Sequence, residues 1–237
     1  PGRYRTADPR LMVPEEELVG LCDDERQHGF APDRFGGRYL VPYDKGGASR
    51  ASEGWLPCYW TPTEYSIDWR RSSVERMKKL PGFRHDGRQF YFRQGITFSH
   101  TGRYAPTFRL GSASVFDTAG STLFCTTLDL RLLLAILNSS TARYLFRVFI
   151  NNSVNVAENP LKEIPLPRVD DAVAGQMIEL VDAITAKQRA DRYYPFHRNE
   201  QREIDRMVAD GYGLTVADRS EIERWHLRRY PRLLGAG

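Results

Sequence analysis

The sequence predicts a mixed α/β fold, in which an irregular, partly antiparallel sheet with packed helices is followed by a C-terminal helical segment. Stretches that alternate polar and apolar residues lie within residues 88–125 and are typical of half-buried strands. Longer stretches with apolar residues at helical spacing follow from residue 128 onward. The 237 residues, 41% of them hydrophobic, are enough to bury a core. We expect one domain at 1–168 and a helical segment at 169–237.

The first half of the chain is expected to supply the strands. A short helix is predicted near 14–21, where Pro14 precedes three glutamates that favour a helix N-terminus. The segment 42–55 is expected to be a loop, because its Gly46-Gly47 pair permits unusual backbone angles. The remaining predicted elements are strands at 38–41, 88–93, 96–99, 107–110 and 114–116 and a helix at 72–80.

The second half is expected to be mostly helical. Helices are predicted at 128–137 and 141–150, with Tyr144, Leu145, Val148 and Phe149 of the second facing inward. The apolar residues of 172–190 recur at helical spacing, and we interpret this stripe as core or as a surface for another domain. A further helix is predicted at 199–210, and Thr215 with Asp218 resembles a capping box that opens the last helix.

Composition excludes several classes of protein. No apolar run approaches the roughly 20 residues that cross a bilayer, and the three cysteines are too scattered for a disulfide framework or a zinc site. The chain begins at Pro1 without an apolar leader, so we expect a cytoplasmic piece of a longer protein with no membrane partner. The 34 basic side chains include only five lysines. Arginine suits phosphates and guanine edges, but a GC-rich genome also favours it.

The sequence lacks the patterns that carry catalysis. The glycines of Gly211-Tyr212-Gly213 follow a helix and not a strand, so they indicate a helix end and not a cofactor loop. Asn159-Pro160-Leu161 lacks the second proline and the aromatic residue of an amino-methyltransferase motif. The five histidines have no metal-ligand spacing. We therefore predict no catalytic residue, no metal and no cofactor in this chain, which favours a binding function.

Several runs of the chain are informative in their order. They are PYDKGG at 42–47, FYFRQGITFS at 90–99, GRYAP at 102–106, LLLAILNS at 132–139, LKEIPLP at 161–167, EIDRMV at 203–208 and YGLT at 212–215. Together these runs resemble the C-terminal target recognition domains, also called TaqI-like specificity domains, of adenine-specific DNA methyltransferases. Those enzymes belong to bacterial type II restriction-modification and phage-exclusion systems. The stretch after Phe98 is shorter than in the family.

The resemblance implies recognition of a sequence in double-stranded DNA. The catalytic domain that binds S-adenosylmethionine would then be a missing N-terminal part, and a fused nuclease would be directed by the same domain. Phosphate contacts set position and base-edge contacts set sequence. We expect phosphate contacts from Lys45, Gly46, Gly47 and Arg50, base contacts from His100, Thr101, Arg103 and Arg109, and further groove contacts from Asn151, Asn152 and Ser153.

Three alternatives remain open at the level of sequence. The first is a specificity subunit that stands alone, for which a duplicated half and long connector helices would be typical. The second is a metal-dependent nuclease with a cryptic site that uses Asp117 and Glu158. The third is a protein-interaction module with no role in DNA binding, which would lack salt-sensitive binding to duplex DNA.

Overall fold

The computed structural model describes residues 3–4, 7–45, 51–116 and 120–235. The chain forms two compact units, and each is discontinuous in sequence. The first unit comprises Pro1–Gly46, Pro62–Gly95 and Gly111–Thr122. The second comprises Gly47–Thr61, Ile96–Leu110 and Leu123–Gly237. The predicted fold class, mixed α/β with a C-terminal helical segment, is confirmed.

The first unit is built on a four-stranded sheet with the order β1-β3-β2-β6. β3 runs antiparallel to both β1 and β2, and Val41 lies opposite Ile67. β2 and β6 are parallel, so the sheet is mixed. The strands are β1 (Arg3–Tyr4), β2 (Leu40–Asp44), β3 (Tyr65–Asp68) and β6 (Val115–Phe116).

Short helices and an aromatic core complete the first unit. The helices are α1 (Glu15–Leu18), α2 (Asp23–His28) and α3 (Arg71–Lys78), with the 3-10 turns η1 (Pro9–Leu11) and η2 (Arg88–Phe90). The Trp69 ring, which is 1% exposed, makes edge-to-face contacts with Tyr91 and Phe92. Aromatic pairs of this geometry add to the free energy gained from burial alone.

The strand predicted at 88–93 is wrong. Residues Arg88–Phe90 form the 3-10 turn η2, and Phe92 has a positive φ of 61°. Tyr91 and Phe92 are both buried although they are neighbours in sequence. A strand would direct neighbouring side chains to opposite faces. The alternation of polar and aromatic residues therefore reflects a turn that places consecutive rings into one core.

The second unit begins with a small sheet of order β5-β4-β7 and the helices that follow it. β4 (Ile96–Phe98) and β5 (Phe108–Leu110) are antiparallel, and β7 is Thr122–Leu123. α4 (Leu130–Asn138) ends at Ser139, whose hydroxyl accepts a hydrogen bond from the Ala142 amide at 3.1 Å. Ser139 thereby caps α5 (Ser140–Leu145), which continues into the π-helical turn η4 (Phe146–Ile150). α6 is Glu158–Leu161.

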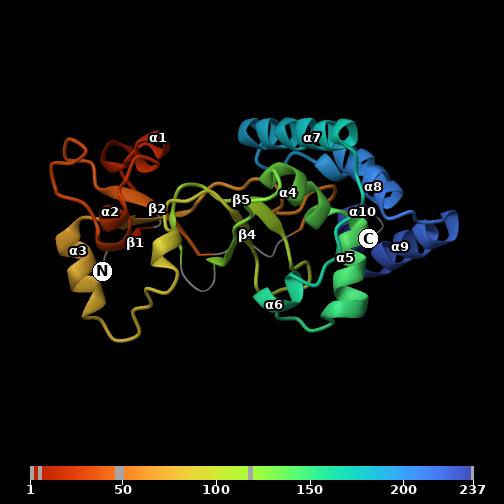
Figure 1. The fold of residues 1–237 in the computed structure, drawn as a ribbon, viewed down its shortest axis with the longest axis horizontal. Coiled ribbons are helices and arrows are strands. Elements are labelled where there is room, and N and C mark those ends of the chain that lie inside the picture. The colour runs from red at the N-terminus through yellow and green to blue at the C-terminus, as the bar shows by residue number, and fades with distance from the viewer. Residues whose placement is uncertain (1–2, 5–6, 46–50, 117–119, 236–237) are drawn as a thin grey trace. The chain divides into compact units, whose positions relative to one another are not determined.

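The rest of the second unit is helical, and Figure 1 shows α7 running beside α8. Met177, Val181 and Ile184 of α7 are fully buried, so the predicted stripe belongs to the core. α7 packs against α4 as well as α8. The elements are α7 (Asp171–Ala190), the 3-10 turn η5 (Phe196–Arg198), α8 (Glu200–Gly211), α9 (Val216–Arg229) and α10 (Pro231–Leu234).

The boundary expected at residue 168 does not coincide with either end of a compact unit. The helices after 168 share one hydrophobic core with β4, β5 and α4. This arrangement follows from the stripe on α7, because an amphipathic helix must bury its apolar face against another element. The helical segment exists as predicted, but it is part of the second unit and not an appendage.

Across the part of the chain that the structure describes, helices are too short or too polar to cross a lipid bilayer.

Candidate functional site

Two segments predicted to contact DNA lie against each other in the second unit. The reading loop, residues 99–106 between β4 and β5, meets the Asn turn, residues 151–156 after η4. The Val156 amide donates to the His100 carbonyl at 2.7 Å, and Thr101 forms an antiparallel bridge with Asn155. The structure therefore brings together groups that are about 50 residues apart in sequence.

Two buried arginines hold the reading loop by its carbonyl groups. The Arg143 guanidinium, 3% exposed, donates to the carbonyls of Tyr104 and Pro106 at 2.9 and 3.1 Å. Arg147, 5% exposed, donates through Nε to the Ala105 carbonyl at 2.9 Å and through Nη1 to the Ser153 carbonyl. Arg147 thus joins the reading loop to the Asn turn.

This pair was not among the predicted site residues, because the wrong face of the helix was expected to lie in the core. Val148 and Phe149 were expected to face inward, but they are 41% and 70% exposed. The π-helical turn at Phe146–Ile150 changes the angular step between residues, so a strictly α-helical pattern fails there. The i, i+4 spacing of Arg143 and Arg147 places both on one face, and that signal was present in the sequence.

The members of the reading loop differ in how freely they present polar groups. Thr101 is exposed. The His100 ring stacks on Phe98 with a centroid distance of 4.9 Å, and its Nε2 atom is buried. Arg103 is exposed, but its Nε and Nη2 donate to the Arg229 carbonyl at 3.3 and 3.1 Å. Arg103 therefore caps the C-terminal end of α9 and keeps Nη1 for another partner.

Arg109 does not fit the role of a base contact. It lies on β5 opposite Thr97 and is only 3% exposed. Both faces of this strand pair are covered, since Phe108 beside it and all of β4 are buried as well, so alternation offers Arg109 no exposed face. We therefore remove Arg109 from the set of residues expected to touch DNA.

The Asn turn is stabilised by its own polar side chains. The Ser153 amide donates to Asn151 Oδ1 at 2.9 Å, and the Ser153 hydroxyl donates to the Asn155 carbonyl at 2.7 Å. Asn151 Nδ2 also donates to the Asn155 carbonyl, at 3.2 Å. Such bonds are typical of turns built by asparagine and serine. Asn152 is exposed at the tip of this turn.

The predicted phosphate-binding loop is only partly described. Lys45 belongs to the first unit, and its Nζ lies 5.6 Å from the centroid of the Tyr65 ring. Gly46, Gly47 and Arg50 lie outside the described residues. Whether they follow a DNA backbone stays a prediction.

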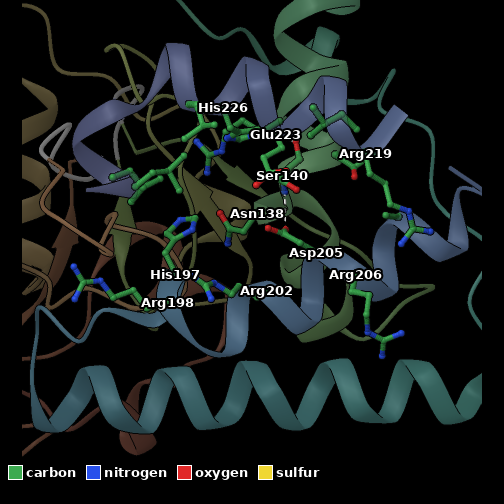
Figure 2. Close-up of a pocket in the computed structure, with 17 residues that line it drawn as sticks. Asn138, Ser140, His197, Arg198, Arg202, Asp205, Arg206, Arg219, Glu223 and His226 are labelled. Carbon is green, nitrogen blue, oxygen red and sulfur yellow. Dashed lines mark hydrogen bonds between the residues drawn. The ribbon is translucent and has the colours of Figure 1, made fainter. Parts of the chain in front are cut away.

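A pocket of about 830 Å³ also lies in the second unit, among α5, η5, α8, α9 and α10 (Figure 2). On one wall the Asp205 carboxylate accepts hydrogen bonds from the Ser140 amide at 2.8 Å and from Gln201 Nε2 at 3.0 Å. His226 Nε2 lies 3.0 Å from the Ser140 carbonyl, which can only accept, so this nitrogen carries the proton.

Burial shifts the ionisation of both groups in this pocket. Loss of solvation raises the pKa of Asp205 to about 6 and lowers the pKa of His226 to about 4. Burial also holds the pKa of His197, a third lining residue, well below its ordinary value. The two histidines are therefore neutral at pH 7.

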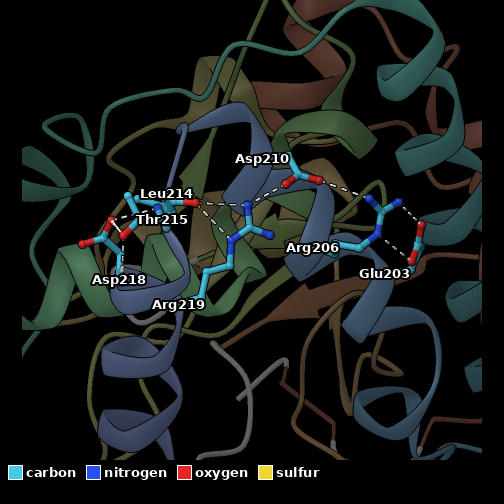
Figure 3. Close-up of polar contacts among 7 residues, drawn as sticks. All are labelled: Glu203, Arg206, Asp210, Leu214, Thr215, Asp218 and Arg219. Carbon is cyan, nitrogen blue, oxygen red and sulfur yellow. Dashed lines mark hydrogen bonds and ion pairs between the residues drawn. The ribbon is translucent and has the colours of Figure 1, made fainter.

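Most arginines at the pocket already have acidic partners. Figure 3 shows Asp210 between Arg206, at 3.1 Å, and Arg219, at 2.6 Å. Arg198 pairs with Glu53. Arg202 differs, because its guanidinium makes no hydrogen bond or ion pair with any residue that the structure describes.

Only one of the two residues named for the alternative nuclease is described, so whether they come together stays a prediction. Glu158 opens the short helix α6, and Asp117 lies outside the described residues. No three histidine, cysteine, aspartate or glutamate residues within the described ranges are grouped so that they could hold a metal ion. No protein-family model matches the chain, and a search of curated proteins gives no significant match.

Proposed function

We propose that this chain recognises a sequence in double-stranded DNA for an adenine-specific DNA methyltransferase of a bacterial restriction-modification system. The observation that supports the proposal most is the convergence of the reading loop and the Asn turn. The reading loop and the Asn turn were each predicted from the sequence to contact DNA, although they are far apart in the chain. Their contact brings exposed polar side chains from two loops together, and such side chains are the groups that contact phosphates and base edges.

In this proposal the exposed side chains read bases and the buried arginines keep them in place. Thr101 and Asn152 each carry a group that donates and accepts hydrogen bonds, and both are exposed. An asparagine amide can bond N6 and N7 of adenine together. Arg103 contributes Nη1 to the groove while its other nitrogens remain on the Arg229 carbonyl. Lys45 contacts phosphate.

The chemistry belongs to a separate catalytic domain in this proposal. That domain would bind S-adenosylmethionine, extrude the target adenine from the duplex and transfer the methyl group. The present chain supplies the sequence specificity, and the whole protein acts in the cytoplasm, where it meets the bacterial chromosome and incoming phage DNA.

The proposal is tested by measuring the base preference of DNA binding after substitution of the exposed residues. We expect Asn152→Ala and Arg103→Ala each to relax the preference at a position of the bound sequence by roughly 5- to 100-fold. Competition between duplexes that differ at single base pairs measures this. Gln176→Ala, an exposed amide on α7, is the matched control and should preserve every preference. Unchanged preferences in both Asn152→Ala and Arg103→Ala would rule out the reading loop and Asn turn as the site of base recognition.

A further inference from the structure

The pocket among α5, α8 and α9 contains polar groups that the fold itself does not use. Thr141 is 2% exposed, lines the pocket, and its hydroxyl has no hydrogen-bond partner among the described residues. The His197 ring likewise makes no hydrogen bond with any described residue. Neither side chain has a polar atom that is closed off from solvent without a partner, so both can form hydrogen bonds with a ligand that enters the pocket.

The charges of the pocket indicate an anion at one end. Arg202 is the lining arginine with no partner in the described structure, and it stands with His197 on the wall where η5 leads into α8 (Figure 2). A guanidinium is planar and presents paired donors that fit a phosphate group. Neutral His197 can donate one further hydrogen bond to the same oxygen atoms.

The opposite wall favours a ligand that also carries hydrogen-bond donors. Glu223 comes from α9 and lines the pocket, and its carboxylate has no hydrogen-bond or ion-pair partner among the described residues. The Glu223 carboxylate would repel a phosphate but would accept from ribose hydroxyls or from the N–H groups of a base. Asp205 lies on α8, one turn from Arg202, and its carboxylate already accepts from the Ser140 amide and from Gln201.

Apolar side chains and the size of the pocket complete the argument. Ile222, Leu227 and Leu233 provide surface on which a flat base can pack. A volume of about 830 Å³ lies within the range of pockets that hold small ligands and cofactors. We propose that this pocket binds a nucleoside monophosphate, with its phosphate on Arg202 and its base and sugar toward Glu223 of α9. The proposal is independent of DNA recognition by the reading loop.

Calorimetric titration of the 237-residue chain with AMP, GMP, CMP and UMP tests this inference. We expect saturable binding of at least one nucleotide with one site per chain. Arg202→Ala should weaken that binding at least tenfold. Arg224→Ala removes an exposed arginine of α9 that pairs with Glu221 outside the pocket, and it should leave the affinity unchanged.

Two further probes separate the nucleotide from other sources of phosphate. Inorganic phosphate and the unphosphorylated nucleoside should each bind at least tenfold more weakly than the nucleotide, because each lacks one end of the ligand. Equal binding of inorganic phosphate, or no saturable binding of any nucleotide at millimolar concentration, would overturn the inference. So would a result in which Arg202→Ala weakens binding to duplex DNA but leaves nucleotide affinity unchanged.

The His197 ring gives a spectroscopic readout that does not depend on heat release. Its proton resonances should shift on nucleotide addition in the wild type and in Arg224→Ala. Shifts confined to His28, which lies on α2 in the first unit, would place the nucleotide elsewhere and contradict the proposal.

Discussion

At the scale of single residues, the second unit depends on cations buried beneath its loops. A buried guanidinium is costly unless its donors are satisfied, and backbone carbonyls can satisfy them. Arg143 and Arg147 each meet at least two carbonyls of the reading loop or the Asn turn. The loops are therefore fixed by the same side chains that would otherwise destabilise the core.

Arg147→Met should destabilise the folded chain by about 2–4 kcal/mol, because it leaves the buried carbonyl of Ala105 without a donor and breaks the bond to the Ser153 carbonyl. Urea denaturation measures the free energy of unfolding. Arg228→Met is the control, since that side chain is 72% exposed and should change the stability by less than about 0.5 kcal/mol. Similar losses of stability in the two variants would contradict the role of Arg147 in holding the reading loop and the Asn turn.

The carboxyl of Asp205 and the imidazole of His226 should act on stability with opposite signs. The folded pKa of Asp205, about 6, lies above its unfolded value, so its contribution is full at low pH and is lost as the pH rises through 6. The folded pKa of His226, about 4, lies below its unfolded value, so its contribution grows as the pH rises from 4 to 6.5.

Asp205→Asn removes the pH-dependent contribution of the Asp205 carboxyl. The free energy of unfolding of this variant should therefore rise more steeply with pH. Relative to the wild type, the variant should gain about 1 kcal/mol between pH 4.5 and pH 6.5, which allows for partial access of solvent through the pocket. Urea denaturation at the two pH values measures the gain. Glu179→Gln on the exposed side of α7 should show no such gain. A parallel pH profile for Asp205→Asn would contradict the assigned burial.

Lys45→Ala should weaken binding to all duplexes about equally and reduce the slope of log affinity against log salt by about one, because a phosphate contact carries no sequence information. Fluorescence anisotropy over a range of salt concentrations measures both. Lys162→Ala is a matched control from the second unit. A loss of affinity for only one DNA sequence would instead indicate that Lys45 contacts a base.

At the scale of elements, helix ends were well predicted because their signals are local. Thr215 Oγ1 accepts from the Asp218 amide at 3.2 Å, and Asp218 accepts from the Thr215 amide at 2.9 Å, which is the predicted capping box of α9. The apolar stripe of α7 was also predicted correctly, since a helix of 20 residues repeats its apolar positions over several turns.

Thr215→Ala should cost about 1 kcal/mol of stability through loss of the cap. Thr215→Ser keeps the hydroxyl and should cost clearly less. Thermal denaturation compares the two. The exposed ion pairs nearby, such as Arg206 with Glu203, should contribute less than the cap, because surface pairs gain little in water. Equal melting temperatures for the two Thr215 variants would show that the cap does not stabilise α9.

Elements that depend on distant contacts could not be predicted from local pattern. The alternation at 88–93 has the form of a strand, but the buried rings of Tyr91 and Phe92 pack around Trp69, more than 20 residues away. The inward face of 141–150 was misassigned because a π-helical turn interrupts the regular period. In the candidate site, the sequence indicated Thr101 and Asn152. The i, i+4 spacing of Arg143 and Arg147 was also present, but it could not show that Arg147 joins the two loops, because the reading loop that Arg147 contacts lies about 40 residues away in sequence.

At the scale of the whole molecule, the sequence predicted the fold class but not how the chain is divided. The two units are interleaved, so segments of one lie between segments of the other in sequence. Most of these crossings fall at a glycine or proline, but ordinary turns elsewhere in the chain use the same residues, so they do not mark a division. A division placed after the proline-containing exit at 161–167 therefore fell inside the second unit. The core after 168 depends on strands some 60 residues earlier, which no local signal encodes.

The most direct test of the account is selection of bound duplexes from a random-sequence library by the 237-residue chain, followed by affinity measurements on the selected duplexes at increasing salt. We predict that the recovered duplexes share one short sequence and that log affinity falls linearly with log salt. Recovery of a random pool, or binding that does not respond to salt, would contradict the claim that this chain reads DNA.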